Sequence, residues 1–140
     1  MKIVLDTNIV VSALLQSKGN PAQVLKLALA GAVQACHDER ILAEYAEVLA
    51  RPRFKFEPKR VREVLAKLDV DGLAVDASGV PNLDLPDVDD EPFLAVALAS
   101  SVDFLLTGNL ADYPPDKRRG CTVVTPAAFM GHWRKSQDEE

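Results

Sequence analysis

The sequence predicts one α/β domain, a three-layer α/β/α sandwich in which helices cover both faces of a central, mostly parallel sheet of about five short strands. Short apolar runs alternate with longer segments whose apolar residues recur at helical spacing. The first run, residues 3–5, is too short for a helix and is bounded by polar residues, which is typical of a strand buried on both faces. The 140 residues, 48% hydrophobic and 26% charged, suffice for one core. We therefore expect a single domain over residues 1–135 and a polar tail at residues 136–140.

Helix-starting and helix-ending residues set the expected boundaries of these elements. Asp6 and the two polar residues after it can cap a first helix, and Pro21, Pro58 and Pro92 favour first helical turns. Gly31 is a typical helix stop. The expected strands are residues 3–5, 32–36, 73–75, 103–107 and 122–124. The expected helices are residues 9–15, 21 to about 31, 37 to about 50, 58–68, 89 to about 101 and 127 to about 134.

Charge is unevenly distributed along the chain. The formal net charge is −5, which argues against a polyanionic partner. One stretch nevertheless carries six basic residues with Phe54 and Phe56 between them. It could contact RNA phosphates and bases, dock a partner protein, or be a solvated helix face. The residues of this basic segment are Arg51, Arg53, Lys55, Lys59, Arg60 and Arg62.

The sequence shows no sign of association with a membrane. No apolar run reaches the roughly 18 to 20 residues of a membrane span, and the N-terminus lacks a signal-peptide pattern. A cytoplasmic location is therefore expected. Cys36 and Cys121 lack metal-binding spacing, and we expect both to be reduced core residues.

Four acids stand where a site at the carboxyl ends of the strands would need them. Asp6 follows the first strand, Asp90 starts a helix and Asp112 follows the fourth strand. Glu44 flanks the apolar stripe of its helix, whereas Glu47 lies nearly opposite that stripe, in solvent. Each acid also has a plainer explanation, as a cap, a turn residue or a solvated boundary residue. Together, hard oxygen ligands without histidine or cysteine suit Mg²⁺ or Mn²⁺ rather than zinc.

Five segments, taken in order, carry a family resemblance. They are VLDTNIVVSAL at residues 4–14, EYAEVLARPRF at 44–54, DVDDEPFL at 87–94, LLTGN at 105–109 and TVVTPAAF at 122–129. This series resembles the PIN-domain family, and most closely the VapC-like toxins of toxin–antitoxin pairs. The resemblance covers almost the whole chain and implies a PIN-like fold.

The resemblance also implies roles for the acids. Asp6, Glu44 and Asp90 would be the three core acids, and Asp112 the fourth, because Asn109 stands where many relatives carry an aspartate. The neighbouring acids Asp87 and Asp89 are rivals of Asp90, but only Asp90 has the family's offset to the following Phe-Leu pair. Residues expected to orient carboxylates or waters are Thr7, Asn8, Thr107 and Asn109.

The resemblance implies a metal-dependent endoribonuclease that hydrolyses RNA phosphodiester bonds with Mg²⁺ or Mn²⁺. It further implies a cognate antitoxin as partner and a homodimer. The alternative is a PIN-like module that binds RNA or protein without cutting. A receiver-like signalling domain fits less well, because such domains need a lysine after a late strand and none follows residues 122–124 until Lys135.

Overall fold

The computed structural model describes residues 1–138, in which five parallel strands form one sheet in the order β3-β2-β1-β4-β5. Val4 of β1 pairs with Leu105 of β4, and Ile3 of β1 pairs with Ala35 of β2. β1 is the central strand, which agrees with the prediction that residues 3–5 form a strand buried on both faces. The sequence order reverses between β1 and β4, which makes their carboxyl ends the topological switch point where α/β sheets bind ligands. The strands are β1 Lys2–Leu5, β2 Gln34–His37, β3 Leu73–Ala74, β4 Phe104–Leu106 and β5 Val123–Val124.

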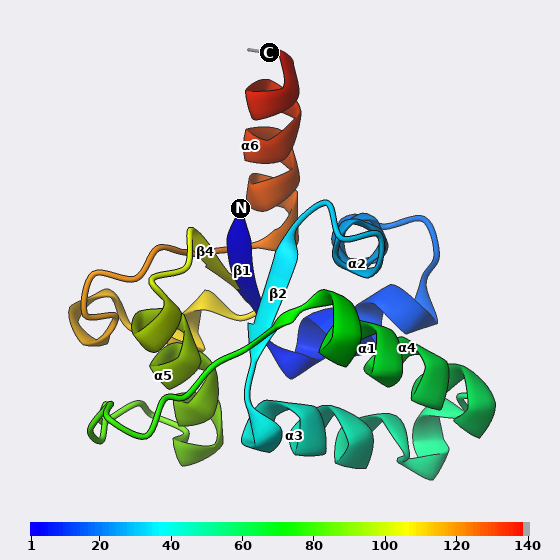
Figure 1. Cartoon of the computed structure of the whole chain (residues 1–140), viewed down its shortest axis with the longest axis horizontal. Coiled ribbons are helices and arrows are strands. Elements are labelled where there is room, and N and C mark those ends of the chain that lie inside the picture. Colours follow the sequence, from blue (N-terminus) through cyan, green and yellow to red (C-terminus); the bar gives the residue numbers. More distant parts are fainter. Residues whose placement is uncertain (139–140) are drawn as a thin grey trace.

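Helices cover both faces of this sheet, so the predicted three-layer arrangement is confirmed. α5 packs against β1, β2 and β4 on one side, while α1, α2 and α4 lie on the other side in Figure 1. α6 contacts α2 and β4 and then projects past the N-terminus of the chain (Figure 1). The helices are α1 Thr7–Leu15, α2 Asn20–Leu29, α3 Glu39–Leu49, α4 Pro58–Asp71, α5 Glu91–Ser100 and α6 Pro126–Asp138. Short 3₁₀ turns lie at η1 Pro52–Phe54, η2 Val88–Asp90, η3 Leu110–Asp112 and η4 Pro115–Lys117.

Side-chain caps and prolines fix where the helices begin. The Asp6 carboxylate accepts a hydrogen bond from the Thr7 amide at the start of α1, and Asp38 accepts one from the Ile41 amide in α3. Such caps satisfy amides that have no partner within the helix. Because Asp6 is the cap that joins β1 to α1, the fold itself holds this acid at the end of the central strand.

The structure corrects several predicted boundaries. His37 ends β2 rather than starting α3, since it is buried and in register with Ala74 of β3. The segment before α5 is a separate 3₁₀ turn, because the Asp87 carboxylate caps it by accepting from the Asp89 amide. α4 continues three residues beyond the predicted end. α6 runs to Asp138, so residues 136–138 of the predicted tail are helical, and residues 139–140 lie outside the described residues. No proline or glycine lies within residues 69–71 or 135–138, and α4 ends directly before Gly72, which is its C-cap.

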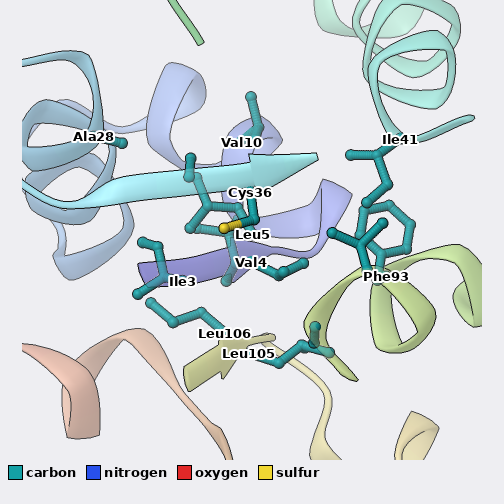
Figure 2. Packing of buried hydrophobic residues seen from close by; sticks show 14 of the residues in the cluster. Ile3, Val4, Leu5, Val10, Ala28, Cys36, Ile41, Phe93, Leu105 and Leu106 are labelled. Carbon is teal, nitrogen blue, oxygen red and sulfur yellow. The ribbon is translucent and has the colours of Figure 1, made fainter. Parts of the chain in front are cut away.

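The core that holds the site in place is made of the central strands and the helices packed on them. Leu5, Leu105 and Leu106 are at most 1% exposed. Figure 2 shows these side chains in one cluster with Cys36 of β2 and Phe93 of α5. Cys36 is a free, buried cysteine, as predicted, whereas Cys121 is free but only partly buried. Among the described residues, no helix is long and apolar enough to span a membrane.

Candidate metal centre

Three carboxylates meet at the carboxyl ends of β1 and β4. Asp6 follows β1, Asp90 ends η2 at the start of α5, and Asp112 ends η3 in the segment after β4. One oxygen from each lies within 4.8 Å of the others. We call these three residues the three-acid centre. Segments far apart in the sequence thus place three negative charges at the switch point of the sheet.

The Asp6 carboxylate is rigidly held. Its side chain is 4% exposed, one oxygen accepts from the Thr7 amide (2.8 Å), and the other accepts from the Thr107 hydroxyl (2.8 Å) and the Tyr113 hydroxyl (3.3 Å). Burial raises the pKa of Asp6 to about 6, although the three hydrogen bonds oppose this rise. The remaining lone pairs of this carboxylate are therefore fixed in direction before any ligand arrives.

Asp90 has a carboxylate oxygen without a hydrogen-bond partner among the described residues. This atom, Oδ2, is buried. Burial, followed by the charges of Asp6 and Asp112, raises the pKa of Asp90 to about 7. None of the ion pairs within residues 1–138 involves the three-acid centre. A buried, unpartnered carboxylate oxygen between two other acids is the environment that a cation would neutralise.

Asp112 is positioned through the predicted orienting residue Asn109. The Asn109 side-chain amide donates to an Asp112 oxygen (3.1 Å), and the Asn109 backbone amide donates to the Thr107 hydroxyl (3.1 Å). That same Thr107 hydroxyl donates to Asp6. A single chain of hydrogen bonds therefore links Asp6 to Asp112, and this chain fixes their relative placement.

Glu44 lies next to the three-acid centre but is not one of its members. It is half-buried on α3 and accepts a hydrogen bond from the hydroxyl of Thr7, the residue that follows Asp6. Burial, and after it the charges of Asp89, Asp87 and Glu47, raises the pKa of Glu44. The structure thus brings three of the four predicted acids together and places the fourth at their edge.

Three other acids near the centre, Glu47, Asp87 and Asp89, do not belong to it. Glu47 is exposed and pairs with Arg51 (3.0 Å). Asp87 caps η2, and the side chain of Asp89 is exposed. Asp90 is therefore the acid of this stretch that reaches Asp6 and Asp112.

The remaining predicted orienting residue, Asn8, has a different contact from the one expected. Its side-chain oxygen accepts from the Gly108 amide (3.0 Å). Asn8 therefore ties the start of α1 to the loop after β4, and no hydrogen bond among the described residues joins it to a carboxylate of the centre.

Two tyrosines of the site were missed by the sequence analysis. Tyr113 is fully buried and donates to Asp6, and burial, followed by the charge of Asp6, raises its pKa well above the ordinary value. Tyr45 of α3 donates from its hydroxyl to the Leu5 carbonyl at the end of β1. The sequence offered little to identify them: Tyr113 is adjacent to Asp112, and Tyr45 lies in the apolar stripe of α3.

The basic segment forms an exposed surface between α3 and α4. All six of its cationic residues are exposed. The rings of Phe54 and Phe56 stack on each other with centroids 5.5 Å apart, and the Arg53 guanidinium lies 4.8 Å from the Phe54 centroid. Arg51 is already paired with Glu47. Five of its cations therefore remain without an ion-pair partner among the described residues.

The composition of the three-acid centre fits a hard divalent cation. Its ligand atoms are carboxylate oxygens only, which suits Mg²⁺ or Mn²⁺. A separate cavity of about 910 Å³ lies beyond the ends of β2 and β3, where His37, Asp69 and Asp76 contribute to its wall. None of the four predicted acids lines it, so its size does not make it the metal centre.

Comparisons with known proteins agree with the fold. A family model described as PIN domain matches residues 2–111. VapBC2 from Rickettsia felis, solved with a DNA fragment from its promoter, is 15% identical with a TM-score of 0.58 over 89% of this chain and 98% of that one. FitAcB from Neisseria gonorrhoeae is 17% identical with a TM-score of 0.54 over 89% and 98% of the two chains. FitAB bound to the IR36 DNA fragment is 18% identical with a TM-score of 0.51 over 89% and 94%. No curated protein sequence matches the chain.

Proposed function

The chain belongs to the PIN-domain family, and from this we propose that it is a metal-dependent endoribonuclease that hydrolyses RNA phosphodiester bonds. The observation that carries the proposal is the three-acid centre, in which oxygens of Asp6, Asp90 and Asp112 lie within 4.8 Å of one another. The negative charges of these acids would repel one another in the absence of a cation, and no cationic side chain among the described residues pairs with them. Family membership confirms the resemblance inferred from the motifs, and the activity is our inference from the site.

Asp6, Asp90 and Asp112 would hold Mg²⁺ or Mn²⁺. The buried, unpartnered Oδ2 of Asp90 supports this, because a cation would supply the partner that the protein lacks. A divalent ion at this centre supplies positive charge and Lewis acidity toward a phosphodiester. The hydrogen bonds from Thr7, Thr107 and Tyr113 to Asp6 remove the need to reorganise that carboxylate on binding.

Glu44 is suited to handling a proton at the edge of the centre. Its raised pKa makes it a better base than an ordinary exposed glutamate, and the Thr7 hydroxyl fixes its direction. In hydrolysis, Glu44 would accept a proton from the attacking water. It is the one predicted acid left free for this task, because the other three face one another.

RNA is the proposed substrate, and the basic segment is the proposed guide for its phosphates. Its unpaired cations offer sequence-independent contacts to a polyanion despite the net charge of −5. The stacked pair of Phe54 and Phe56 offers apolar surface between these cations. Docking of a partner protein on the same surface is the alternative use.

We further propose that the protein is the toxin of a toxin–antitoxin pair, held inactive by a cognate antitoxin, and that it forms a homodimer in the cytoplasm. The similar folds of VapBC2 from Rickettsia felis and FitAcB from Neisseria gonorrhoeae support the first part. The extended similarity of fold, over 89% of this chain in both comparisons, is the basis for this extrapolation.

RNA cleavage by the purified protein with added Mn²⁺ tests the activity. Wild type should cut single-stranded RNA, and Asp6→Asn should not, while its circular dichroism spectrum stays unchanged because asparagine can still cap α1. Asp89→Asn, one residue before Asp90 and exposed, is the matched control and should cleave like wild type. Cleavage by Asp6→Asn at the wild-type rate would reject the centre. Absence of cleavage by a folded, Mn²⁺-loaded wild type would favour the non-cutting binding module.

A further inference from the structure

A second cavity, of about 500 Å³, adjoins the three-acid centre. It lies between the first turn of α1, the start of α2, the loop after β4 and the start of α6. Two of its wall residues also belong to the surroundings of the acids, since Asn109 donates to Asp112 and Asn8 follows Asp6 by two residues. A substrate whose phosphate reaches the acids would therefore extend a neighbouring group into this cavity. The cavity is lined by Asn8, Ile9, Ser12, Asn20, Pro21, Gly108, Asn109, Thr125, Pro126 and Ala127.

The wall of this cavity carries no charged side chain. Its polar members are asparagines, a serine and a threonine. Among the described residues, no hydrogen bond engages the side chains of Ser12 and Asn20, the side-chain NH₂ of Asn8 or the side-chain oxygen of Asn109. The cavity thus offers several free amide and hydroxyl groups, which can both donate and accept hydrogen bonds. The proline and isoleucine side chains supply apolar faces between them.

This chemistry favours an uncharged ring with polar edges over a phosphate. Although three helices begin at the cavity, Pro21 and Pro126 have no amide hydrogen to donate. The amides of Thr7 and Ala128 are taken by the caps Asp6 and Thr125. Four of the positions that could offer an amide to a phosphate at these helix starts are therefore without a hydrogen or already occupied.

We propose that this cavity receives one unpaired nucleobase of the RNA, next to the phosphate positioned at the three-acid centre. The free asparagine and serine groups would bond to the edges of the base, and the apolar faces would contact its ring. A base inside a duplex has its edge paired, so the proposal assigns the enzyme a single-stranded or looped cleavage site. This inference rests on the proposed nuclease function.

A matched pair of substitutions on α6 tests the cavity. Ala127 and Ala128 are adjacent and both exposed, but only Ala127 lines the cavity. Ala127→Trp should fill it, whereas Ala128→Trp adds the same bulk outside. Ser12→Phe, at an exposed position of α1, fills it from another wall. Equal melting temperatures of the variants establish that each is folded.

The readout is single-turnover cleavage of an unstructured oligoribonucleotide and of copies in which each base near the cut is removed in turn. For wild type and Ala128→Trp, one abasic position should lower cleavage by roughly tenfold, a factor within the range expected for one base contact. Ala127→Trp and Ser12→Phe should cut the intact RNA about as slowly as wild type cuts the sensitive abasic RNA. Removal of the base at that sensitive position should not slow these two variants further.

The outcomes separate this inference from the function on which it rests. Equal cleavage of intact RNA by Ala127→Trp and Ala128→Trp, with the same abasic profile, overturns the base site while the nuclease stands. A wild type that cuts no RNA overturns the nuclease and the base site with it. Slow cleavage by Ala127→Trp, when no abasic position slows cleavage by wild type, overturns the base site as well, because the added ring then acts by blocking the phosphate.

Discussion

Replacing Asp90 by asparagine should stabilise the metal-free protein near neutral pH. Burial and the charges of Asp6 and Asp112 raise the pKa of Asp90 from 3.8 to about 7 in the folded state. The folded protein therefore retains a proton that the unfolded chain releases, so the contribution of Asp90 to stability is most favourable below pH 3.8 and is lost as the pH rises toward about 7. Asparagine occupies the same volume without the charge and should avoid this loss.

The size of the effect follows from the pKa difference. The interval between 3.8 and about 7 corresponds to roughly 4 kcal/mol, at about 1.4 kcal/mol for each pH unit. Asp90 is only half-buried, so solvent screening should reduce this to about 2 kcal/mol. In a domain of this size that is a rise in melting temperature of roughly 6 to 10 °C.

Urea unfolding followed by circular dichroism, with a chelator present, measures this directly. The gain in the free energy of unfolding for Asp90→Asn should be about 2 kcal/mol at about pH 8.5 and several-fold smaller at about pH 4.5. Asp89→Asn, the exposed neighbour, should stay within about 0.5 kcal/mol of wild type at both values. A destabilised Asp90→Asn at high pH, or a gain that does not change with pH, would refute the reasoning that this carboxylate is strained by its surroundings.

The other predictions concern metal, hydrogen bonding and RNA. Millimolar Mg²⁺ or Mn²⁺ should raise the melting temperature of wild type and of Glu47→Gln but much less that of Asp90→Asn; equal shifts in the two variants would contradict the placement of the acids. Thr107→Val should lower the free energy of unfolding by about 1 to 3 kcal/mol, because it removes the hydrogen bonds to Asp6 and from Asn109, and Thr107→Ser should restore most of it in urea unfolding. Neutralising the basic segment should weaken RNA binding whatever the sequence and reduce the slope of log affinity against log salt by about 0.7 for each phosphate that the protein no longer neutralises; an unchanged slope together with abolished antitoxin binding would make this surface a partner-docking site.

The sequence was sufficient to predict the fold, and it singled out the three acids that the structure brings together. The apolar run at residues 3–5 and the cap formed by Asp6 are local sequence signals. The structure has both features, with residues 3–5 buried in the central strand. In the sequence, only its spacing to the Phe-Leu pair at residues 93–94 distinguished Asp90 from Asp87 and Asp89 as the candidate site residue. The structure agrees, since that offset places Asp90 at the last residue of η2, directly before α5.

What the sequence could not supply depends on tertiary packing. The Tyr113 hydroxyl donates to a residue 107 positions away in the sequence, Asp6, and no local pattern encodes such a contact. Glu44 was expected among the metal ligands, yet the Thr7 hydroxyl holds it at the edge of the three-acid centre. His37 has the polar character of a helix start but belongs to β2, because pairing with β3 determines where that strand ends.

Binding of Mn²⁺ to the purified protein, followed by the electron paramagnetic resonance signal of free Mn²⁺, tests the three-acid centre most directly. Wild type and Asp89→Asn should deplete the free-ion signal alike, and more strongly as the pH rises through about 7, where the Asp90 proton stops competing. Asp6→Asn and Asp90→Asn should deplete it far less at every pH. Equal depletion by all four proteins would place the ion elsewhere and contradict the assignment of these carboxylates as a metal centre.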